Sequence, residues 1–295
     1  MRVLIAGASG MIGSELARQL GDGGHEVRRL VRRDPRSSAE LRWDPAARLI
    51  DAGVMETTDA VVNLSGASIS RIPWTAASKR RILSSRLEAT HTLADAMRAA
   101  ATAPAVFVSG SAVGFYGDRP GQKLTESAIK GTGFLSDVVE AWESAAHLAP
   151  AATRVVTIRT GVVIGRGGAM KPLLPLARLG LTGPIAGGGQ YWPWVSLADE
   201  AKAVVHLLTS ALRGPVNIAG PTPATADAVL RAMAHSVHRP YGLPVPKKAV
   251  TLALGEAGRE LLLASQKVVP QKLLDDGFVF GDRTVQEAMD RLVAR

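Results

Sequence analysis

The sequence contains no cysteine among its 295 residues, so neither disulfides nor thiolate-ligated metal sites can form. Long apolar runs are also absent, since none reaches the roughly 18–20 residues that a membrane-spanning helix needs. The six histidines stand apart and share no metal-ligand spacing with carboxylates, so no metal site is predicted. Met1 is followed at once by a predicted strand, which predicts that no signal peptide is present. Together these absences predict a cytoplasmic protein with no membrane partner.

Cationic residues outnumber anionic ones by 35 to 26, which gives a formal net charge of +9. An excess of this size makes nucleic acid a partner to consider. The cations are scattered, however, with short clusters at VRRDPR and SKRRILSSR and no long basic tail. Both clusters also suit an anionic cofactor, so the charge favours a phosphate-bearing small molecule over nucleic acid.

A glycine loop lies between a predicted strand and a predicted helix at the start of the chain. An apolar run at residues 3–6 leads into Gly7, Gly10 and Gly13, and apolar residues then recur every four positions from Ile12. Such glycines allow a tight turn, the close approach of a pyrophosphate and the packing of the helix on the strand. The helix N-terminus adds free N–H groups and a partial positive charge for the phosphates. We therefore predict a dinucleotide site here.

A second predicted strand, HEVRRLV, ends where a Rossmann-type fold places the adenosine ribose of its cofactor. An acidic residue at this position selects NAD, whereas an arginine accommodates the 2′-phosphate of NADP. Arg32 and Arg33 occupy the position, and Asp34 follows them. The alternative is that both arginines are solvated loop residues. The pattern favours NADP as the cofactor.

Strand and helix patterns alternate along most of the remaining chain. DAVVNLSGA, PAVFVSGSA and RVVTIRTGVVIG are typical of buried strands, and helical patterns lie between them. The alternation predicts an α/β fold, Rossmann-like, with a doubly wound parallel sheet that binds ligands at the carboxyl ends of its strands. We expect an NADP-binding domain at residues 1–165 and a smaller C-terminal substrate lobe at residues 166–295, with the segment up to about residue 220 contributing to both.

Six segments resemble, in order, the extended and atypical branches of the short-chain dehydrogenase/reductase family: GASGMIG, NLSGA, SGSAVGFYGD, IRTGVVIGRGG, WVSLADEAKAVV and VNIAGP. More narrowly, RWDP, NLSGASI and the tail LLLASQKVVPQKLLDDGFVF resemble a group called epimerase family proteins, which carries a C-terminal domain of unknown function, here near residues 244–292. The resemblance covers nearly the whole chain. It implies an NADP-binding Rossmann-like domain and a smaller lobe that closes over a substrate cleft, and it implies no particular substrate.

The resemblance also implies roles for residues of the cofactor site. The pyrophosphate loop matches Gly7, Ser9, Gly10, Met11, Ile12 and Gly13. The 2′-phosphate position matches Val31, Arg32 and Arg33, and the strand-end loop beside the adenine-side ribose matches Leu64, Ser65 and Gly66. Arg86 matches a helix arginine that reaches towards the phosphates, where many extended members have asparagine, and Val163 lies in the segment that passes near the nicotinamide.

The catalytic tyrosine and lysine of the family are missing from this chain. Aligned on Glu143, they fall on Leu135 and Val139, which can neither transfer protons nor bind the ribose by hydrogen bonds. Positioned acid–base catalysis is worth about 10²–10⁴-fold in rate, so the loss is serious, although the cofactor itself carries the hydride. Ser111 matches the serine that hydrogen-bonds the substrate oxygen. Tyr116 is the candidate replacement proton donor, and its alternative is a packing role.

The predicted function is that of an NADP-dependent oxidoreductase or epimerase-like enzyme acting on a small polar substrate, for which a nucleotide sugar is one candidate. The alternative is a non-catalytic NADP-binding regulatory protein, because some relatives are labelled cell-division inhibitors and such a protein tolerates the loss of the tyrosine and lysine. The expected partner is a small-molecule substrate, with neither nucleic acid nor a membrane, in a monomer or homodimer.

Overall fold

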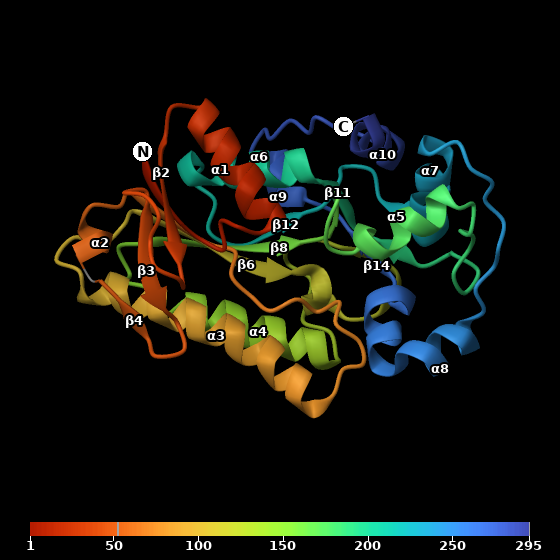
Figure 1. Ribbon diagram of the computed structural model, residues 1–295, viewed down its shortest axis with the longest axis horizontal. Coiled ribbons are helices and arrows are strands. Elements are labelled where there is room, and N and C mark those ends of the chain that lie inside the picture. Colours follow the sequence, from red (N-terminus) through yellow and green to blue (C-terminus); the bar gives the residue numbers. More distant parts are fainter. Residues whose placement is uncertain (52, 295) are drawn as a thin grey trace.

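The computed structural model describes residues 1–51 and 53–294 and is built around an eight-stranded sheet (Figure 1). Across the sheet the strands follow the order β12, β8, β6, β5, β1, β2, β3 and β4. All neighbouring strands are parallel except β3 and β4. The strands are β1 Arg2–Ala6, β2 Glu26–Val31, β3 Glu40–Asp44, β4 Leu49–Ile50, β5 Ala60–Asn63, β6 Val106–Ala112, β8 Arg154–Thr160 and β12 Gly214–Ile218.

The direction in which the sheet grows reverses beside β1. The chain adds β2, β3 and β4 on one side of β1, and then adds β5, β6, β8 and β12 on the other side. Doubly wound sheets bind their ligands at such a switch point, outside the carboxyl ends of the strands. The predicted α/β fold with a doubly wound, mostly parallel sheet is therefore confirmed, and the glycine loop after β1 lies at the expected binding edge.

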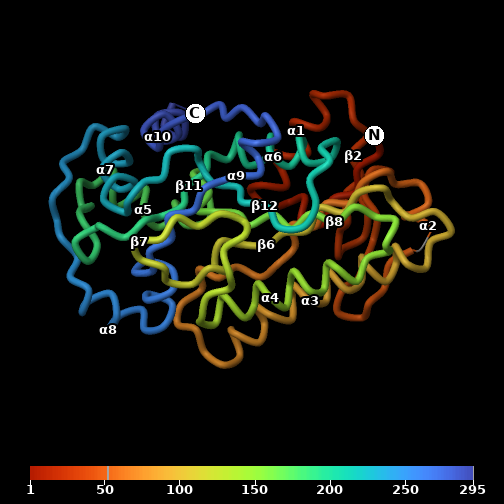
Figure 2. Tube along the Cα trace, turned by 180° about the vertical axis from the view of Figure 1, so that it is seen from behind, coloured from red at the N-terminus to blue at the C-terminus, as the bar shows by residue number. Residues whose placement is uncertain are grey.

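Helices cover both faces of the sheet, as Figures 1 and 2 show. One face carries α1 (Met11–Asp22) and α6 (Leu197–Thr209), and the opposite face carries α3 (Ala76–Ala99) and α4 (Phe134–Ala146). The short α2 (Gly53–Glu56) precedes β5. Within the described ranges, no helix is long and apolar enough to cross a membrane.

The sequence of β1 explains why two helical layers are needed. Successive side chains of a strand point to opposite faces. Val3 and Ile5 therefore enter the core on the α1 and α6 side, whereas Leu4 and Ala6 enter the core on the α3 side. All four side chains are inaccessible to solvent. A strand that is apolar at every position is stable only when both faces of its sheet are covered.

A smaller lobe lies beyond the carboxyl edge of the sheet and has its own apolar core. Three two-stranded pairings tie it together: β9 with β11, β10 with β13, and β7 with β14. The 3₁₀ turn η1 Val113–Tyr116 and β7 Arg119–Leu124 belong to the larger lobe. The smaller lobe contains β9 Val162–Ile164, α5 Met170–Arg178, β10 Tyr191–Trp192, β11 Trp194–Ser196, β13 Ala224–Thr225, α7 Ala226–Ser236, α8 Lys247–Gly258, the π-helix η2 Arg259–Leu263, β14 Gln266–Val268, α9 Gln271–Asp275 and α10 Val285–Ala294.

The two lobes share part of the larger core. β12 and α6 follow the first segments of the smaller lobe in the sequence, yet they belong to the sheet and its helical layer. Leu273, Phe278 and Phe280, near the C-terminus, are also buried in the core on the α1 and α6 side. The C-terminal segment therefore holds the smaller lobe against the sheet, beside the carboxyl ends of the strands.

Candidate cofactor and substrate sites

The three glycines after β1 meet three different spatial demands. Gly7 has φ +84°, and a Cβ there would lie 2.7 Å from the carbonyl carbon of Leu64, because the ends of β1 and β5 nearly touch. A Cβ on Gly13 would overlap the Gly7 carbonyl oxygen, so α1 packs directly on the turn. A Cβ on Gly10 would meet only the Gly7 oxygen, at 3.3 Å. The surface over Gly10 is open, as a pyrophosphate requires.

The N-terminus of α1 faces this open surface. Gly10 is the N-cap, and no side chain caps the helix in the structure described. The first turn contains no acidic residue, so its partial positive charge is not neutralised locally. Ser9 and Gly10 are exposed, whereas Met11 and Ile12 are half-buried. A phosphate placed over Gly10 would meet the free N–H groups of this turn.

The arginines that follow β2 differ in their partners. Arg33 forms a two-pronged ion pair with Glu40, at 2.6 and 2.8 Å, and this pairing lowers the pKa of Glu40 to about 2. Arg32, by contrast, is exposed, and its side chain has no hydrogen bond or ion pair with any residue that the structure describes. Val31, the last residue of β2, is half-buried beneath them. Of the two arginines proposed for the 2′-phosphate, Arg32 is therefore the free one.

Arg86 projects from α3 to the loop that follows β5. One of its terminal nitrogens, Nη1, donates to the carbonyls of Ala67 at 3.1 Å and Ile82 at 2.8 Å. Its guanidinium lies 5.0 Å from the ring centre of Trp142. No carboxylate of residues 1–51 or 53–294 pairs with it, and burial lowers the pKa of Arg86 to about 10. A half-buried guanidinium without a counter-ion favours an anionic ligand nearby.

Hydrogen bonds of Asn63 hold the loop beside Arg86 in place. Asn63, at the end of β5, accepts from the backbone N–H of Ser65 at 3.1 Å and donates to Thr90 at 3.0 Å. A Cβ on Gly66 would lie 3.2 Å from the guanidinium carbon of Arg86. Leu64, Ser65 and Gly66 therefore lie between the glycine loop and Arg86, at the switch point of the sheet.

A cavity of about 320 Å³ adjoins the first turn of α1 and extends towards α10. Met11, Gly165 and Arg166 contribute to its lining, and Val163 lies buried in the adjacent β9. Arg166 is exposed and has no ion pair within the described ranges. Arg166 was not predicted from the sequence, although its position in IGRGG, two residues after a strand end, indicates a binding loop.

Tyr116 does not occupy the position expected of a proton donor. Its side chain is fully buried, and its hydroxyl donates to Asn217 Oδ1 at 2.6 Å and accepts from Arg159 Nη1 at 3.1 Å. Burial raises the pKa of Tyr116 above its ordinary value. The expectation that Tyr116 moves a proton to a substrate needs correction, because its only proton is committed inside the core and the packing alternative fits.

Ser111 belongs to the same buried hydrogen-bond network as Tyr116. It is 5% exposed, and its hydroxyl donates to Glu143 Oε1 at 2.6 Å. Because a hydroxyl has one proton, only its lone pairs remain for a ligand. In this arrangement Ser111 can accept from a substrate hydroxyl but cannot polarise a carbonyl. In the hydrogen bond to a substrate oxygen that the resemblance implied, Ser111 would therefore be the acceptor.

Arg159 lies at the centre of this network, and its role was not predicted from the sequence. Its guanidinium forms a two-pronged ion pair with Glu143, at 2.8 and 2.9 Å, and lies 3.5 Å from the ring centre of Phe115. Arg159 is 3% exposed, so the pair is removed from water. A buried ion pair is strongly destabilising when one partner is lost. The network therefore holds β6, η1, α4 and β8 in fixed positions relative to one another.

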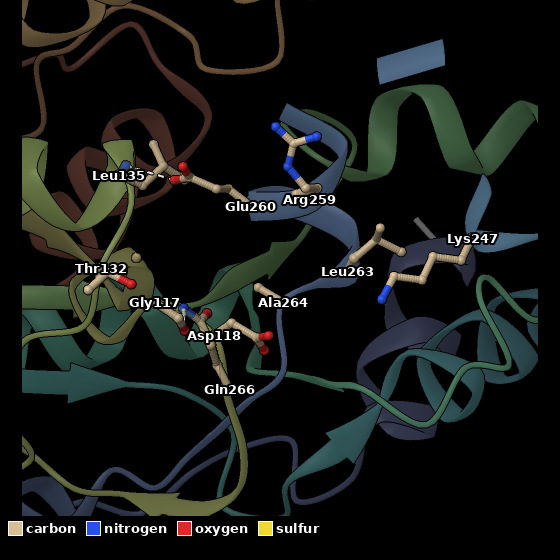
Figure 3. A pocket seen from close by; sticks show the side chains of 11 residues that line it. Gly117, Asp118, Thr132, Leu135, Lys247, Arg259, Glu260, Leu263, Ala264 and Gln266 are labelled. Atoms are coloured by element: carbon tan, nitrogen blue, oxygen red, sulfur yellow. Dashed lines mark hydrogen bonds between the residues drawn. The ribbon is translucent and has the colours of Figure 1, made fainter. Parts of the chain in front are cut away.

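Leu135 and Val139, which stand where the family has its catalytic tyrosine and lysine, have different surroundings. Val139 is 2% exposed and packs inside the protein. Leu135 lines a cavity of about 280 Å³ between the two lobes (Figure 3). Neither side chain can transfer a proton. The other residues that line the cavity are Gly114, Gly117, Asp118, Thr132, Lys247, Arg259, Glu260, Leu263, Ala264 and Gln266.

Glu260 closes one side of this cavity by capping α4 from the other lobe. Its carboxylate accepts from the backbone N–H groups of Phe134 at 2.9 Å and Leu135 at 2.8 Å. The N-cap of α4 is Gly133, with φ +116° and no side chain to serve as a cap. A carboxylate at a helix N-terminus is favourable because it satisfies free donors and the helix dipole. Figure 3 shows Glu260 pointing at the start of this helix.

The tryptophans near residue 192 pack inside the smaller lobe. Trp192 is 4% exposed and donates from its indole to the carbonyl of Leu262 at 3.1 Å. Trp194 is 1% exposed and donates to the carbonyl of Thr222 at 2.9 Å. Both side chains are therefore structural and are not available to stack on a sugar.

Models of two families match the chain. The model described as "NAD dependent epimerase/dehydratase family" matches residues 3–219, and the domain of unknown function DUF1731 matches residues 245–292. Epimerase family protein MT2273 of Mycobacterium tuberculosis (strain CDC 1551 / Oshkosh) is 38% identical over 296 residues, covering 99% of this chain and 98% of the relative. Epimerase family protein SDR39U1 of Homo sapiens is 35% identical over 299 residues, covering 100% of both chains.

Solved structures give the same picture. The crystal structure of human epimerase family protein SDR39U1 (isoform 2) with NADPH superposes with a TM-score of 0.91 at 32% identity, covering 100% of this chain and 99% of that one. The UDP-glucose 4-epimerase of Thermus thermophilus, in complex with NAD, gives a TM-score of 0.78 at 22% identity, covering 100% and 98%. At that level of identity the second likeness shows the fold alone.

A doubly wound sheet with a glycine loop at its switch point defines a Rossmann-like nucleotide-binding protein. This chain belongs to the NAD dependent epimerase/dehydratase family and carries DUF1731 at its C-terminal end. The resemblance to the short-chain dehydrogenase/reductase type, and to the group with a C-terminal domain of unknown function, is confirmed.

Proposed function

We propose that this protein binds NADP and acts as an oxidoreductase or epimerase-like enzyme on a small polar substrate held between the lobes. The observation that carries the proposal is a set of cationic groups without counter-ions around an open cradle. Arg32 and Arg86 have no carboxylate partner in the described residues, and the surface over Gly10 is free. A 2′-phosphate and a pyrophosphate would supply the missing negative charge at these points. The NADPH in the structure of the human relative supports this assignment.

The proposed roles of the residues in this chain are as follows. The α1 N-terminus and Arg86 bind the pyrophosphate, and Arg32 binds the 2′-phosphate. Bound NADPH supplies the hydride. Ser111 accepts a hydrogen bond from a substrate hydroxyl, and Glu143 orients it. Because Leu135 carries no proton, the proton is exchanged with water in the cavity.

A non-catalytic NADP-binding regulator is the second candidate, and one observation favours it. No side-chain proton donor is free at the expected positions. Tyr116, the candidate donor, and Ser111 both donate their hydroxyl protons to buried acceptors, and Leu135, where the family has its tyrosine, is apolar. A binding protein that senses NADPH needs no proton donor.

Turnover assays separate the two candidates. The purified protein would be incubated with NADPH or NADP⁺ and a panel of aldehydes, ketones, 2-oxo acids and nucleotide sugars, including 4-keto sugars. NADPH would be followed by absorbance and each compound by chromatography, because an epimerisation consumes no net cofactor. NADPH consumption or conversion of one of these compounds, absent in the Gly10→Val variant, supports the enzyme. Tight NADPH binding without turnover of any compound in the panel supports the regulator.

Arg32→Ala is expected to weaken NADPH binding by about 1–3 kcal/mol, the range for loss of a charged hydrogen bond, and to leave NADH binding nearly unchanged. Arg33→Ala is the matched control, because Arg33 is already paired with Glu40. Calorimetric titration of both variants with both cofactors provides the measurement. An equal loss of NADPH affinity in the two variants would show that Arg32 has no special role at the 2′-phosphate.

A further inference from the structure

The cavity beside Leu135 contains two carboxylates, and both are engaged by backbone N–H groups. Glu260 accepts from two amides at the start of α4. Asp118 accepts from the backbone N–H of Ser265 at 2.8 Å. These two acids therefore hold the lobes together, and their charge is already stabilised by the protein.

The two cations that line the same cavity have no such partners. The side chains of Lys247 and Arg259 are exposed and form no hydrogen bond or ion pair within the part of the chain described. Neighbouring lysines differ in this respect, since Lys79 pairs with Glu256 across the lobes and Lys130 pairs with Asp137. The cavity thus has two positive charges that no described residue neutralises.

The position of Lys247 is unfavourable for the stability of its own helix. Lys247 and Lys248 open α8, whose first turn contains no acidic residue. A cation at a helix N-terminus opposes the helix dipole. The same dipole adds to the positive potential around the cavity. In Figure 3 the Lys247 side chain extends from α8 towards Leu263 and Ala264, across the cavity from Asp118. This is the arrangement expected where an anion completes the site.

The size of the cavity limits what it can hold. Its volume of about 280 Å³ is close to the lower end of the range for small-molecule sites. Apolar Leu135 and Leu263 line it together with the charged groups. A compact molecule with one anionic end fits this volume and lining better than a large nucleotide does.

We propose that this cavity binds a small anionic substrate, a carboxylic acid or a phosphate monoester, through Lys247 and Arg259. The proposal rests on the function proposed above, because Leu135 places the cavity where a reacting group would lie. Both cations belong to the C-terminal domain of unknown function, residues 245–292. This domain therefore binds the anionic end of the substrate and selects for it.

The test is calorimetric titration of the full-length protein, saturated with NADP⁺, with malonate, glycerol 3-phosphate, glycerol and UDP-glucose. At least one of the two small anions is expected to bind saturably and more tightly than UDP-glucose, and glycerol is expected not to bind. Lys247→Ala and Arg259→Ala should each weaken that binding by about tenfold, as for loss of one charged hydrogen bond. Lys248→Ala is the matched control, because Lys248 has the same charge and also lies in the first turn of α8 but does not line the cavity.

Three results would overturn the proposal: no saturable binding of either small anion, an equal loss in Lys248→Ala, or UDP-glucose binding more tightly than both. A stronger response to malonate identifies the carboxylate source, and a stronger response to glycerol 3-phosphate identifies the phosphate source. The titrations are repeated without cofactor. If NADP⁺ does not bind but Lys247→Ala still weakens anion binding, the proposed function is wrong and the anion site is supported.

Discussion

The Gly10→Val variant is expected to fold and to lose NADPH binding to below the limit of measurement. Gly10 has φ −75° and ψ 168°, which valine adopts without strain, and a Cβ would meet only the Gly7 oxygen, at 3.3 Å. The isopropyl group would instead fill the open surface that a pyrophosphate needs. The phosphates would then lose contact with the free N–H groups and the partial positive charge of the α1 N-terminus.

Two other glycines of this region are controls. Gly21→Val also places valine in α1, but a Cβ there has no neighbour within 4 Å, so binding should persist. Gly13→Val should unfold the protein or destabilise it severely, because a Cβ there overlaps the Gly7 carbonyl oxygen. Circular dichroism would monitor folding, and fluorescence titration would monitor NADPH binding. NADPH binding by Gly10→Val with parental affinity would mean that the loop does not hold the phosphates.

Glu200→Gln is expected to abolish a large pH dependence of stability. Glu200 lies fully buried on α6, where burial raises its pKa to about 8, and its one hydrogen-bond partner among the described residues is the Thr160 hydroxyl at 2.8 Å. The unfolded chain releases this proton near the ordinary value of 4.5, so between the two values the folded state binds more protons. The free energy of unfolding therefore falls as pH rises, by about 1.4 kcal/mol per unit and on the order of 5 kcal/mol in total.

Below pH 4.5 the protonated carboxyl costs little, and above about pH 8 the whole loss has occurred. Glutamine keeps an acceptor for Thr160 and cannot ionise, so the variant should gain stability over the parent as pH rises. Urea unfolding at several pH values between 5 and 9 would measure the difference. Glu88→Gln is the control, since Glu88 is half-buried and its carboxylate makes no hydrogen bond in the described structure. Parallel pH profiles for parent and Glu200→Gln would refute the account of this residue.

The sequence was sufficient to predict the fold because its signals are local. Apolar runs such as residues 3–6 and 60–62 correspond to strands that are buried on both faces. Glycines at fixed offsets after β1 place the loop at the switch point. The short strands β3 and β4 had no such signal. Arg32 and Arg33 looked equivalent in sequence, and only the position of Glu40 distinguishes them.

The substrate side could not be predicted in the same way, because its character depends on distant residues. Tyr116 follows a strand end in a loop pattern typical of a reactive position. Whether its hydroxyl is free depends on Asn217, 101 residues later, and on Arg159. The cap of α4 comes from Glu260, 125 residues after Leu135. No spacing rule connects such pairs, since they meet only when the smaller lobe packs on the sheet.

The most direct test of the central claim is a calorimetric titration of the unmodified protein with NADPH and, separately, with NADH. We expect saturable binding of NADPH at one site per chain, at least tenfold tighter than binding of NADH, a difference of about 1.4 kcal/mol. Failure of NADPH to bind, or equal affinity for the two cofactors, would contradict it.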